Sequence, residues 1–283
     1  MRNVLPLFPF SLSSSGSLGL LTILIIIAFC LFGPVLFGLE PYEMSDDLLS
    51  VPNWLGGNGG VLGTDDLGRD QLARLVYGAR SSLAIGVVVV LISCTVGSLL
   101  GLYAACFGGA VDRAITRLVD VIMSLPSILL AIVIVAVLGP GLVNAMFAVA
   151  LVSMPRFVRI VRAVALAEMQ KQYISAARTC GASTQQIIWS EVLPNCWGAI
   201  IVQASLGFSD AILEIAALGF LGLGAQPPTA EWGAMLADSR AFIASEPQLM
   251  LFPGLCIFLT VISFNLLGDA LQDLLDPRLG GRR

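Results

Sequence analysis

The stretch YISAARTCGASTQQIIWSEVLP, residues 173–194, mixes small, polar and apolar residues between two long hydrophobic runs. Gly181 is expected to end a first short helix, because a glycine commonly follows a helix C-terminus. Ser183, with Gln186 three residues later, predicts a capping box at the start of a second helix. Pro194 is expected to end that second helix. The stretch therefore predicts two short helices that meet at a glycine.

The composition of the whole chain is that of a membrane protein. Of its 283 residues, 57% are hydrophobic and only 12% are charged, whereas soluble proteins carry about 25% charged residues. The net charge of −4 argues against a nucleic-acid partner. The six cysteines are scattered and predict neither a disulfide framework nor a zinc site.

Six hydrophobic segments are long enough to cross a bilayer as helices, which takes about 20 residues. They are residues 18–38, 83–106, 116–138, 142–161, 197–223 and 250–270. The turn sequence Gly139-Pro140-Gly141 separates the third from the fourth. We prefer a retained helix to a signal peptide for 18–38, because the run is long and no A-x-A site follows it. The predicted fold class is therefore an all-α integral membrane protein with six transmembrane helices.

Basic residues near the ends of the spans predict the orientation. With the N-terminus inside, the inner segments hold Arg2, Arg113, Arg117, Arg156, Arg159, Arg162, Lys171, Arg178, Arg278, Arg282 and Arg283. The outer segments hold Arg69, Arg74, Arg80 and Arg240. Both termini are therefore predicted to be cytoplasmic. The segments 39–80 and 224–249 lie outside, and the stretch 173–194 belongs to the longest inner loop.

Two acidic residues fall inside the fifth span. Asp210 and Glu214 are four residues apart and share one helix face. Because ionisable groups in a membrane are costly and usually face the bundle interior, we expect them to line or border a translocation path. The alternative is that one or both are hydrated near the outer interface. Ser263 and Asn265 in the sixth span are weaker lining candidates, and helix–helix hydrogen bonding is the competing interpretation for them.

Small residues and prolines predict how the spans pack. Gly97 and Gly101 form a G-x-x-x-G pattern, which permits close helix contact. Pro126 and Pro155 are expected to kink their helices or to mark helix boundaries.

The outer segment 62–83 is expected to contain an amphipathic helix. Leu72, Leu75 and Val76 follow the helical i, i+3, i+4 spacing. We expect this helix to lie on the outer interface, with its arginine side chains reaching to water.

The inner loop carries an apolar set that predicts a partner. Trp189 and the paired Ile187 and Ile188 would not stay on a solvated loop without something to cover them. The alternative is that the two helices lie on the inner membrane surface, with their basic residues at lipid headgroups. The residues alone leave both interpretations open.

At these residues the sequence resembles a known family. Ser175-Ala176-Ala177, then Gly181, then Ile187 or Ile188, then Leu193-Pro194 are similar to the "EAA…G…I..LP" loop of bacterial ABC importer permeases. Ser175 stands where many members have Glu. The stretches 62–83, 202–236 and 252–279 also resemble permeases of peptide and nickel importers, above all the dipeptide branch. The likeness covers about residues 15–280.

The resemblance implies a type I importer core with a MetI-like fold and a coupling helix that docks into an ATPase. The implied coupling residues are Tyr173, Ser175, Ala176, Ala177, Arg178, Gly181, Ala182, Ile187, Ile188, Leu193 and Pro194. The implied organisation is an N-terminal helix and periplasmic segment over 1–80, a five-helix core over 81–275 with the coupling loop at 163–195, and a cytoplasmic tail over 276–283.

The resemblance also implies partners and a cargo. The partners are a second permease subunit, two cytoplasmic ABC ATPase subunits, an extracytoplasmic peptide-binding protein and the lipid of a bacterial inner membrane. The implied cargo is dipeptides, with haem as a further cargo in the dipeptide branch. Oligopeptides, nickel and antimicrobial peptides are the alternatives within the family. A secondary transporter or channel is the alternative from another class.

The chain itself is not expected to be an enzyme. Its single lysine, Lys171, lies between Gln170 and Gln172 and cannot belong to a P-loop. With no histidine, common acid–base and metal chemistries lack their usual residue. We therefore expect no cofactor or metal on this chain, with ATP and Mg²⁺ bound by the partner ATPases.

Overall fold

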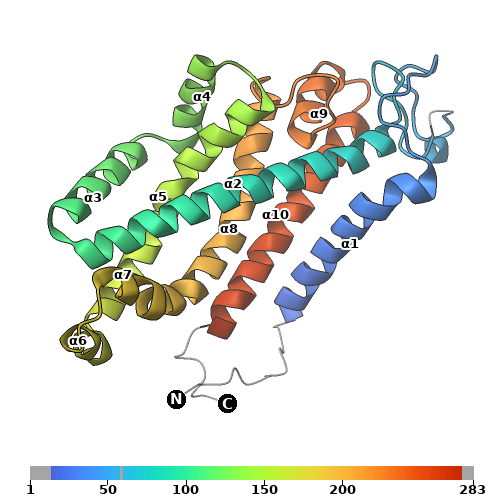
Figure 1. Cartoon of the computed structure of the whole chain (residues 1–283). Helices are drawn as coiled ribbons and strands as arrows, with labels where there is room; N and C mark the ends of the chain where they lie inside the picture. Colours follow the sequence, from blue (N-terminus) through green and yellow to red (C-terminus); the bar gives the residue numbers. More distant parts are fainter. Residues whose placement is uncertain (1–13, 58–59, 276–283) are drawn as a thin grey trace.

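The computed structural model describes residues 14–57 and 60–275, which form a bundle of long helices with shorter helices at both ends (Figure 1). The elements are α1 (Ser14–Phe37), the 3₁₀ turn η1 (Asn53–Leu55), α2 (Gln71–Phe107), α3 (Gly109–Met123), α4 (Ser127–Leu138), α5 (Leu142–Met169), α6 (Gln172–Thr179), α7 (Thr184–Ile187), the π-helical turn η2 (Ile188–Val192), α8 (Leu193–Phe220), α9 (Trp232–Asp238), the 3₁₀ turn η3 (Ser239–Phe242) and α10 (Gln248–Leu275). The expected tail 276–283 and the basic residues Arg2, Arg278, Arg282 and Arg283 lie outside the described residues.

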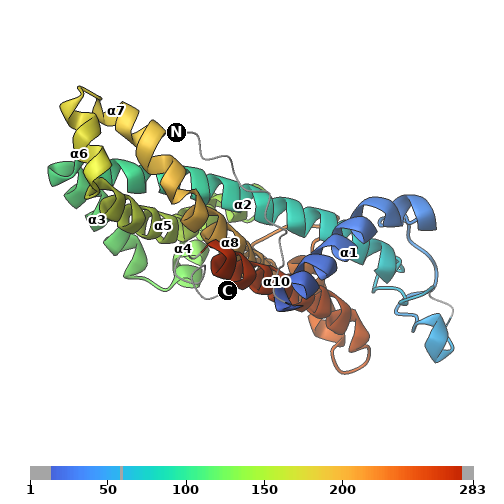
Figure 2. The same ribbon diagram turned by 90° about the horizontal axis from the view of Figure 1, so that it is seen from below.

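The helices confirm an all-helical membrane protein. Within the described ranges, four helical stretches are long and apolar enough to cross a membrane: Ser14–Val35, Gln71–Phe107, Thr184–Phe220 and Gln248–Leu275. The pair of α3 and α4 makes a fifth if it is counted as one broken span. α6 and α7 lie at the same end of the bundle as the start of α1 and the end of α10, and α9 lies at the other end (Figure 1). From below, α1 runs beside α10 and away from α3, α4 and α5 (Figure 2).

The third predicted span is not one helix. Where we predicted a helix over 116–138, α3 and α4 meet at an angle of 91°. Pro126 accounts for the break, because proline disfavours the helical conformation of the residue before it and has no N–H to donate. Ser124 closes α3 instead: its N–H and its hydroxyl both donate to the carbonyl of Val121, at 3.3 and 2.7 Å. Pro126 therefore marks a boundary, as expected.

The prediction that Pro194 ends its helix is wrong. α7 continues through the π turn into α8, so that Thr184–Phe220 is one helical stretch. In the π turn the N–H of Leu193 donates to the carbonyl of Ile188, five residues back. Proline is tolerated in the first turn of a helix, where its missing N–H costs no hydrogen bond. Because the chain widens into a π turn just before Pro194, the proline sits at the start of α8 without interrupting it.

α2 and α5 cross closely at the two glycines of the G-x-x-x-G pattern, as predicted. A Cβ placed on Gly97 would lie 2.6 Å from the Cβ of Phe157 and 2.8 Å from the carbonyl oxygen of Met154. A Cβ on Gly101 would lie 2.8 Å from the carbonyl oxygen of Val158. The two backbones can approach this closely only because these positions carry no side chain.

We predicted that the helix within 62–83 lies on the outer interface with its arginine side chains in water. This prediction is wrong for the start of α2. Arg74 is buried, with its Nε 3.4 Å from Asp65 and its Nη2 3.5 Å from Asp238. Arg80 donates its Nε to the carbonyl of Cys30 in α1, at 2.7 Å. The acids of the outer segments and the carbonyls of α1 are within reach, so the arginines pair with them instead of with water. The expected domain boundary at residue 80 falls inside this continuous helix.

We expect Gly97→Ala to destabilise the chain, because overpacking at a rigid contact costs about 1–3 kcal/mol. Gly254→Ala in α10 is the matched control, since a Cβ at Gly254 meets nothing within 4 Å. The apparent melting temperature in detergent should fall for Gly97→Ala and should hold or rise for Gly254→Ala. Equal melting temperatures for the two variants would contradict the close crossing.

Candidate coupling surface and intramembrane polar cluster

The α6–α7 hairpin (residues 172–192, comprising α6, α7 and η2) is shaped by local backbone hydrogen bonds. α6 ends in a Schellman motif: the N–H of Ala182 donates to Ala177 and the N–H of Gly181 donates to Arg178, both at 3.0 Å. Gly181 has a φ of +88°, which a residue with a side chain adopts only under strain. The predicted helix end at Gly181 is therefore confirmed.

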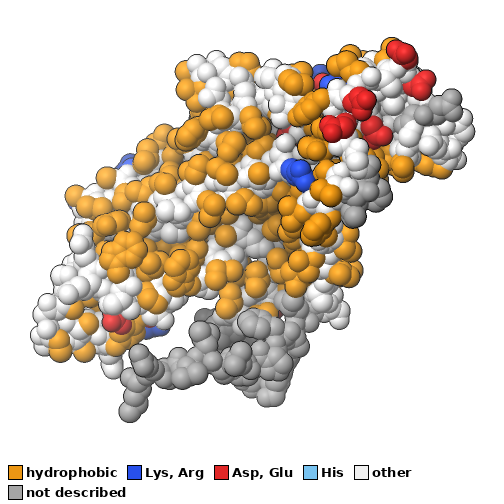
Figure 3. All heavy atoms as spheres, turned by 45° about the vertical axis from the view of Figure 1, so that its right-hand side comes forward, with side chains coloured by type: hydrophobic (Ala, Val, Ile, Leu, Met, Phe, Trp, Pro, Cys, Tyr) orange, Lys and Arg blue, Asp and Glu red, His pale blue; other side chains and the backbone are white. Residues whose placement is uncertain are grey.

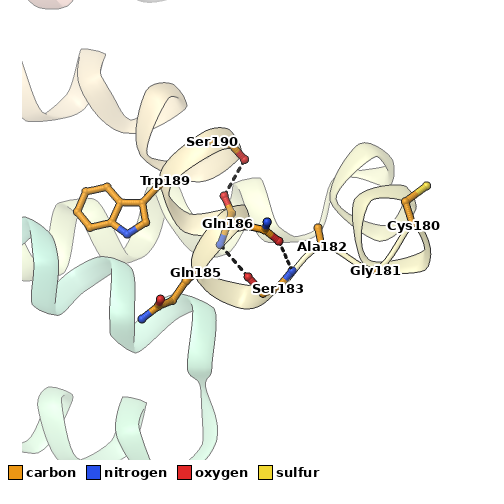
Figure 4. Close-up of a pocket in the computed structure, with 8 residues that line it drawn as sticks. All are labelled: Cys180, Gly181, Ala182, Ser183, Gln185, Gln186, Trp189 and Ser190. Carbon is orange, nitrogen blue, oxygen red and sulfur yellow. Dashed lines mark hydrogen bonds between the residues drawn. The ribbon is translucent and has the colours of Figure 1, made fainter.

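The predicted capping box is also confirmed. The hydroxyl of Ser183 accepts the N–H of Gln186 at 3.3 Å, and the side-chain oxygen of Gln186 accepts the N–H of Ser183 at 2.8 Å (Figure 4). These two bonds set the direction in which α7 leaves the glycine turn, and α7 continues without a break into α8.

The inner face of the hairpin packs on its own chain. Ile187 and Ile188 are each 1% exposed, and with Ile174 they contact a cluster that includes Leu102 of α2 and Val161 of α5. The expectation that the paired isoleucines wait for an outside partner is therefore wrong. α2 and α5, which are distant in sequence, cover them and hold the hairpin in place.

The other face of the hairpin is uncovered. Trp189 is 51% exposed, and Ser175, Ala176 and Arg178 are also exposed. Beside the tryptophan lies an open hollow of ≈ 830 Å³ (Figure 4). It is lined by Cys180, Gly181, Ala182, Ser183, Gln185, Gln186, Trp189 and Ser190. A half-exposed tryptophan at the edge of a hollow, on a rigid backbone, is a surface suited to a protein partner.

A polar network ties α6 to its neighbours. Glu168, at the end of α5, is buried and lies 2.6 Å from the Nζ of Lys171. The hydroxyl of Tyr173 donates to the same carboxylate, and the amide of Asn195 donates to the Tyr173 hydroxyl at 3.3 Å. Burial alone would raise the pKa of Glu168, but the hydrogen bonds from Lys171 and Tyr173 outweigh it and hold that pKa below its usual value. Sequence analysis missed this network, although the i, i+3 spacing of Glu168 and Lys171 was a local signal for one part of it.

Asp210 and Glu214 belong to a polar cluster inside the bundle, which we define as Ser127, Ser153, Arg156, Asp210 and Glu214. Arg156 of α5 forms an ion pair with Asp210 of α8. Ser127 and Ser153 lie beside the carboxylate of Glu214. Sequence analysis assigned Arg156 only to the inner basic residues, because its partner is 54 positions away. The cluster joins α4, α5 and α8.

The structure does not bring the other two lining candidates into this cluster. Ser263 is buried near α1, and its hydroxyl donates to the carbonyl of Leu259 in its own helix at 2.6 Å. Asn265 is exposed on α10. Over the described part of the chain, neither forms a hydrogen bond or ion pair with Asp210 or Glu214. In the same ranges, no group of three or more His, Cys, Asp and Glu residues could hold a metal ion.

At the opposite end from the hairpin, acidic side chains gather on the surface (Figure 3). The segment 39–70 contains seven acidic residues and one arginine, Arg69, which is paired with Asp65 at 2.7 Å. Backbone bonds such as Ser45 N–H to Gly68 and Thr64 N–H to Ser50, both at 3.0 Å, hold the segment together. It presents exposed apolar side chains, and Trp54 is the most prominent. The described part of this segment is therefore an acidic surface with exposed apolar side chains.

Long apolar helices, a charged cluster inside the bundle and an uncovered hairpin at one end define a membrane transport component. Residues 97–281 match the family model described as "Binding-protein-dependent transport system inner membrane component", and the chain belongs to this family. It is therefore a multi-pass inner-membrane permease subunit of an ABC transport system and not an ATPase, so the family resemblance noted in its sequence is confirmed.

Two relatives cover nearly the whole chain. It is 49% identical over 270 residues to the "Di/tripeptide transport system permease protein DppC" of Pseudomonas aeruginosa (strain UCBPP-PA14), which covers 94% of this chain and 89% of that protein. It is 48% identical over 273 residues to the "Dipeptide transport system permease protein DppC" of Escherichia coli (strain K12), which covers 95% and 91%.

A solved structure shares the fold. The MetNI methionine ABC transporter, in an inward-facing crystal form, contains a chain that matches with a TM-score of 0.58 at 22% identity. The match covers 71% of this chain and 96% of that chain. The expected likeness to MetI-type permeases is therefore confirmed for the fold.

We expect Tyr173→Phe to loosen α6, because it removes a hydrogen bond to a buried carboxylate and the acceptor for Asn195. A hydrogen bond to a charged group is worth about 1.5–3 kcal/mol, so amide hydrogen exchange in α6 should accelerate about tenfold. Tyr42→Phe, at an exposed tyrosine in the segment 39–70, should leave exchange in α6 unchanged. Unchanged exchange in Tyr173→Phe would show that the network does not hold α6.

The same network predicts a pH dependence. Because folding lowers the pKa of Glu168 from its ordinary 4.5, the ionised carboxylate stabilises the fold above that pH. The stabilisation is lost as the pH falls through the lower pKa of the folded state. Exchange protection of α6, corrected for the intrinsic exchange rate, should be constant between about pH 6 and 8 and should fall only in acid. A loss of protection on approaching neutral pH would contradict this assignment.

Proposed function

We propose that this chain is one of two permease subunits of an ATP-driven importer of dipeptides, with six transmembrane helices and both termini in the cytoplasm. The names of the two relatives, a di/tripeptide and a dipeptide permease at 48–49% identity, support the cargo. The excess of basic residues in the inner segments supports the orientation. α3 and α4 together form the third span and α5 the fourth.

The uncovered face of the α6–α7 hairpin carries this proposal. Tyr173, Ser175, Ala176, Arg178 and Trp189 form an exposed surface beside the hollow, and a cytoplasmic ATPase subunit docks there. The small side chains of Ser175 and Ala176 allow close approach. The other coupling residues hold this surface in shape. These are Ala177, Gly181 and Ala182 in the Schellman turn, Ile187 and Ile188 in the buried cluster, and Leu193 and Pro194 at the start of α8.

The docked surface is linked to the transport path through α8. A displacement of the hairpin is carried along one helical stretch to Asp210 and Glu214. These two residues border the path. Ser263 and Asn265 do not, because Ser263 is bonded within α10 and Asn265 is exposed on α10. ATP and Mg²⁺ bind to the ATPases, and this chain holds no cofactor of its own.

The acidic segment 39–70 lies on the opposite side and faces the extracytoplasmic peptide-binding protein. Its exposed apolar side chains, among them Trp54, support a protein contact. Its net negative charge favours a partner with a basic rim over an anionic lipid surface. Uptake of oligopeptides, nickel or antimicrobial peptides in preference to dipeptides would assign the chain to another branch of the family, whereas haem would be a further cargo within the dipeptide branch.

We expect Trp189→Ala to weaken ATPase association at least tenfold, because truncating a hot-spot tryptophan costs about 2 kcal/mol or more. ATP-dependent uptake of a labelled dipeptide into proteoliposomes should fall with it. The complex contains this chain, its partner permease, the ATPases and the binding protein.

Trp197→Ala is the matched control. Trp197 is 52% exposed, lies on the same helical stretch two turns further on, and does not line the hollow. It should insert, associate and transport as the unmodified chain does. If Trp189→Ala inserts normally and still binds the ATPase at full strength, the hairpin is only a membrane-surface element and the coupling proposal fails.

A further inference from the structure

The break between α3 and α4 lies at a cavity. Irregular backbone within a membrane is tolerated where it is buried in protein or lines a water-filled space. Beside this break is a cavity of ≈ 170 Å³. It is lined by Ile122, Met123, Leu125, Ser127, Val152 and Arg156. Broken helices that meet near the middle of a bilayer are a common way for transporters to build a substrate site.

One charged side chain, Arg156, lines this cavity, and the acidic Asp210 and Glu214 lie next to its lining residues Arg156 and Ser127. Arg156 is paired with Asp210, and both side chains are about 40% exposed (38% and 42%), so the pair is open and not sealed in the core. Glu214 lies one helical turn further along α8. Its Oε2 is buried and has no hydrogen-bond partner, and the same holds for the hydroxyl of Ser153. The hydroxyls of Ser127 and Ser153 lie beside this carboxylate, and its two oxygens can accept a further hydrogen bond from a polar guest.

The spacing of the charges suits a short zwitterion. Asp210 and Glu214 are four residues apart, which is about 6 Å along a helix axis. Arg156 is held at the level of Asp210 by their ion pair. The guanidinium of Arg156 and the carboxylate of Glu214 are therefore separated by roughly the length of two extended residues, about 7 Å.

We propose that Arg156 and Glu214 form a transit site that reads the two charged ends of a peptide. Glu214 accepts hydrogen bonds from the α-ammonium group. Arg156 donates to the α-carboxylate, which replaces Asp210 on the guanidinium. The exchange keeps the charge of Arg156 paired in both states, and it releases the carboxylate of Asp210, whose side chain is 42% exposed. This site rests on the proposed function.

The first test uses the complete transporter in proteoliposomes, with its binding protein and labelled Ala-Ala as the probe. Glu214→Gln and Arg156→Gln should each lower ATP-dependent uptake about tenfold or more, the cost of one charge-assisted hydrogen bond. Asp120→Asn is the matched control: it removes the partner of Arg159 from an ion pair between α3 and α5, 2.8 Å long, whose two residues do not line the cavity. Its uptake should match that of the unmodified chain.

A charge swap separates substrate recognition from a structural ion pair. The double variant R156D/D210R keeps an ion pair between α5 and α8 but reverses the group that faces the peptide carboxylate. We expect it to assemble and to melt like the unmodified complex, while uptake stays as low as in Arg156→Gln. Uptake restored by the swap, or full uptake in Glu214→Gln, would overturn the transit site. If the unmodified complex takes up no Ala-Ala at all, the proposed dipeptide cargo is wrong as well.

Discussion

The continuity of the helix across Pro194 is the constraint on which the rest of the structure depends. In a bilayer each backbone N–H must be bonded within its own helix, so a proline at the membrane entrance would normally separate a surface loop from the span that follows. The π turn at Ile188–Val192 removes that separation. The second arm of the hairpin, α7 with η2, and the span are therefore parts of one helical stretch. Trp189 lies 21 residues before Asp210, or about 30 Å at 1.5 Å per residue.

The two faces of the hairpin therefore have different roles: one is fixed to the bundle and the other is uncovered. Ile187 and Ile188 are packed against α2 and α5, and the Glu168 network ties α6 to the start of α8. The hairpin therefore cannot shift without moving these helices. Its other face, around Trp189, is uncovered and free to receive a partner. A family whose members take their energy from a separate ATPase needs both properties, a fixed inner face and a free outer face.

The sequence predicts well where the deciding interactions are local. Gly181 and the pair Ser183 and Gln186 form bonds within five residues, and all three were correctly interpreted. The prolines mark the limit: Pro126 breaks a helix and Pro194 does not, because the π turn before Pro194 is not encoded in a recognisable local pattern.

Ion pairs between residues far apart in the chain could not be predicted either, because no local pattern encodes them. The ion pair of Arg156 with Asp210 spans 54 positions, and Arg74 is buried between acids from two separate outer segments. A basic residue near a span end fits the general orientation rule equally well, whether it faces water or a buried carboxylate. Only the packing of α5 on α8, and of α2 on α9, distinguishes the two cases.

The most direct measurement is the distance between spin labels at Thr179, at the end of α6, and Leu221, just beyond α8, by pulsed electron paramagnetic resonance. Both positions are exposed, and neither lines the hollow. The complete complex would be compared without nucleotide and with ATP bound. If the hairpin and α8 move as one body, the same single distance is found in both states. A second distance, or a shift on binding ATP, would place a hinge between the two labels and contradict the account.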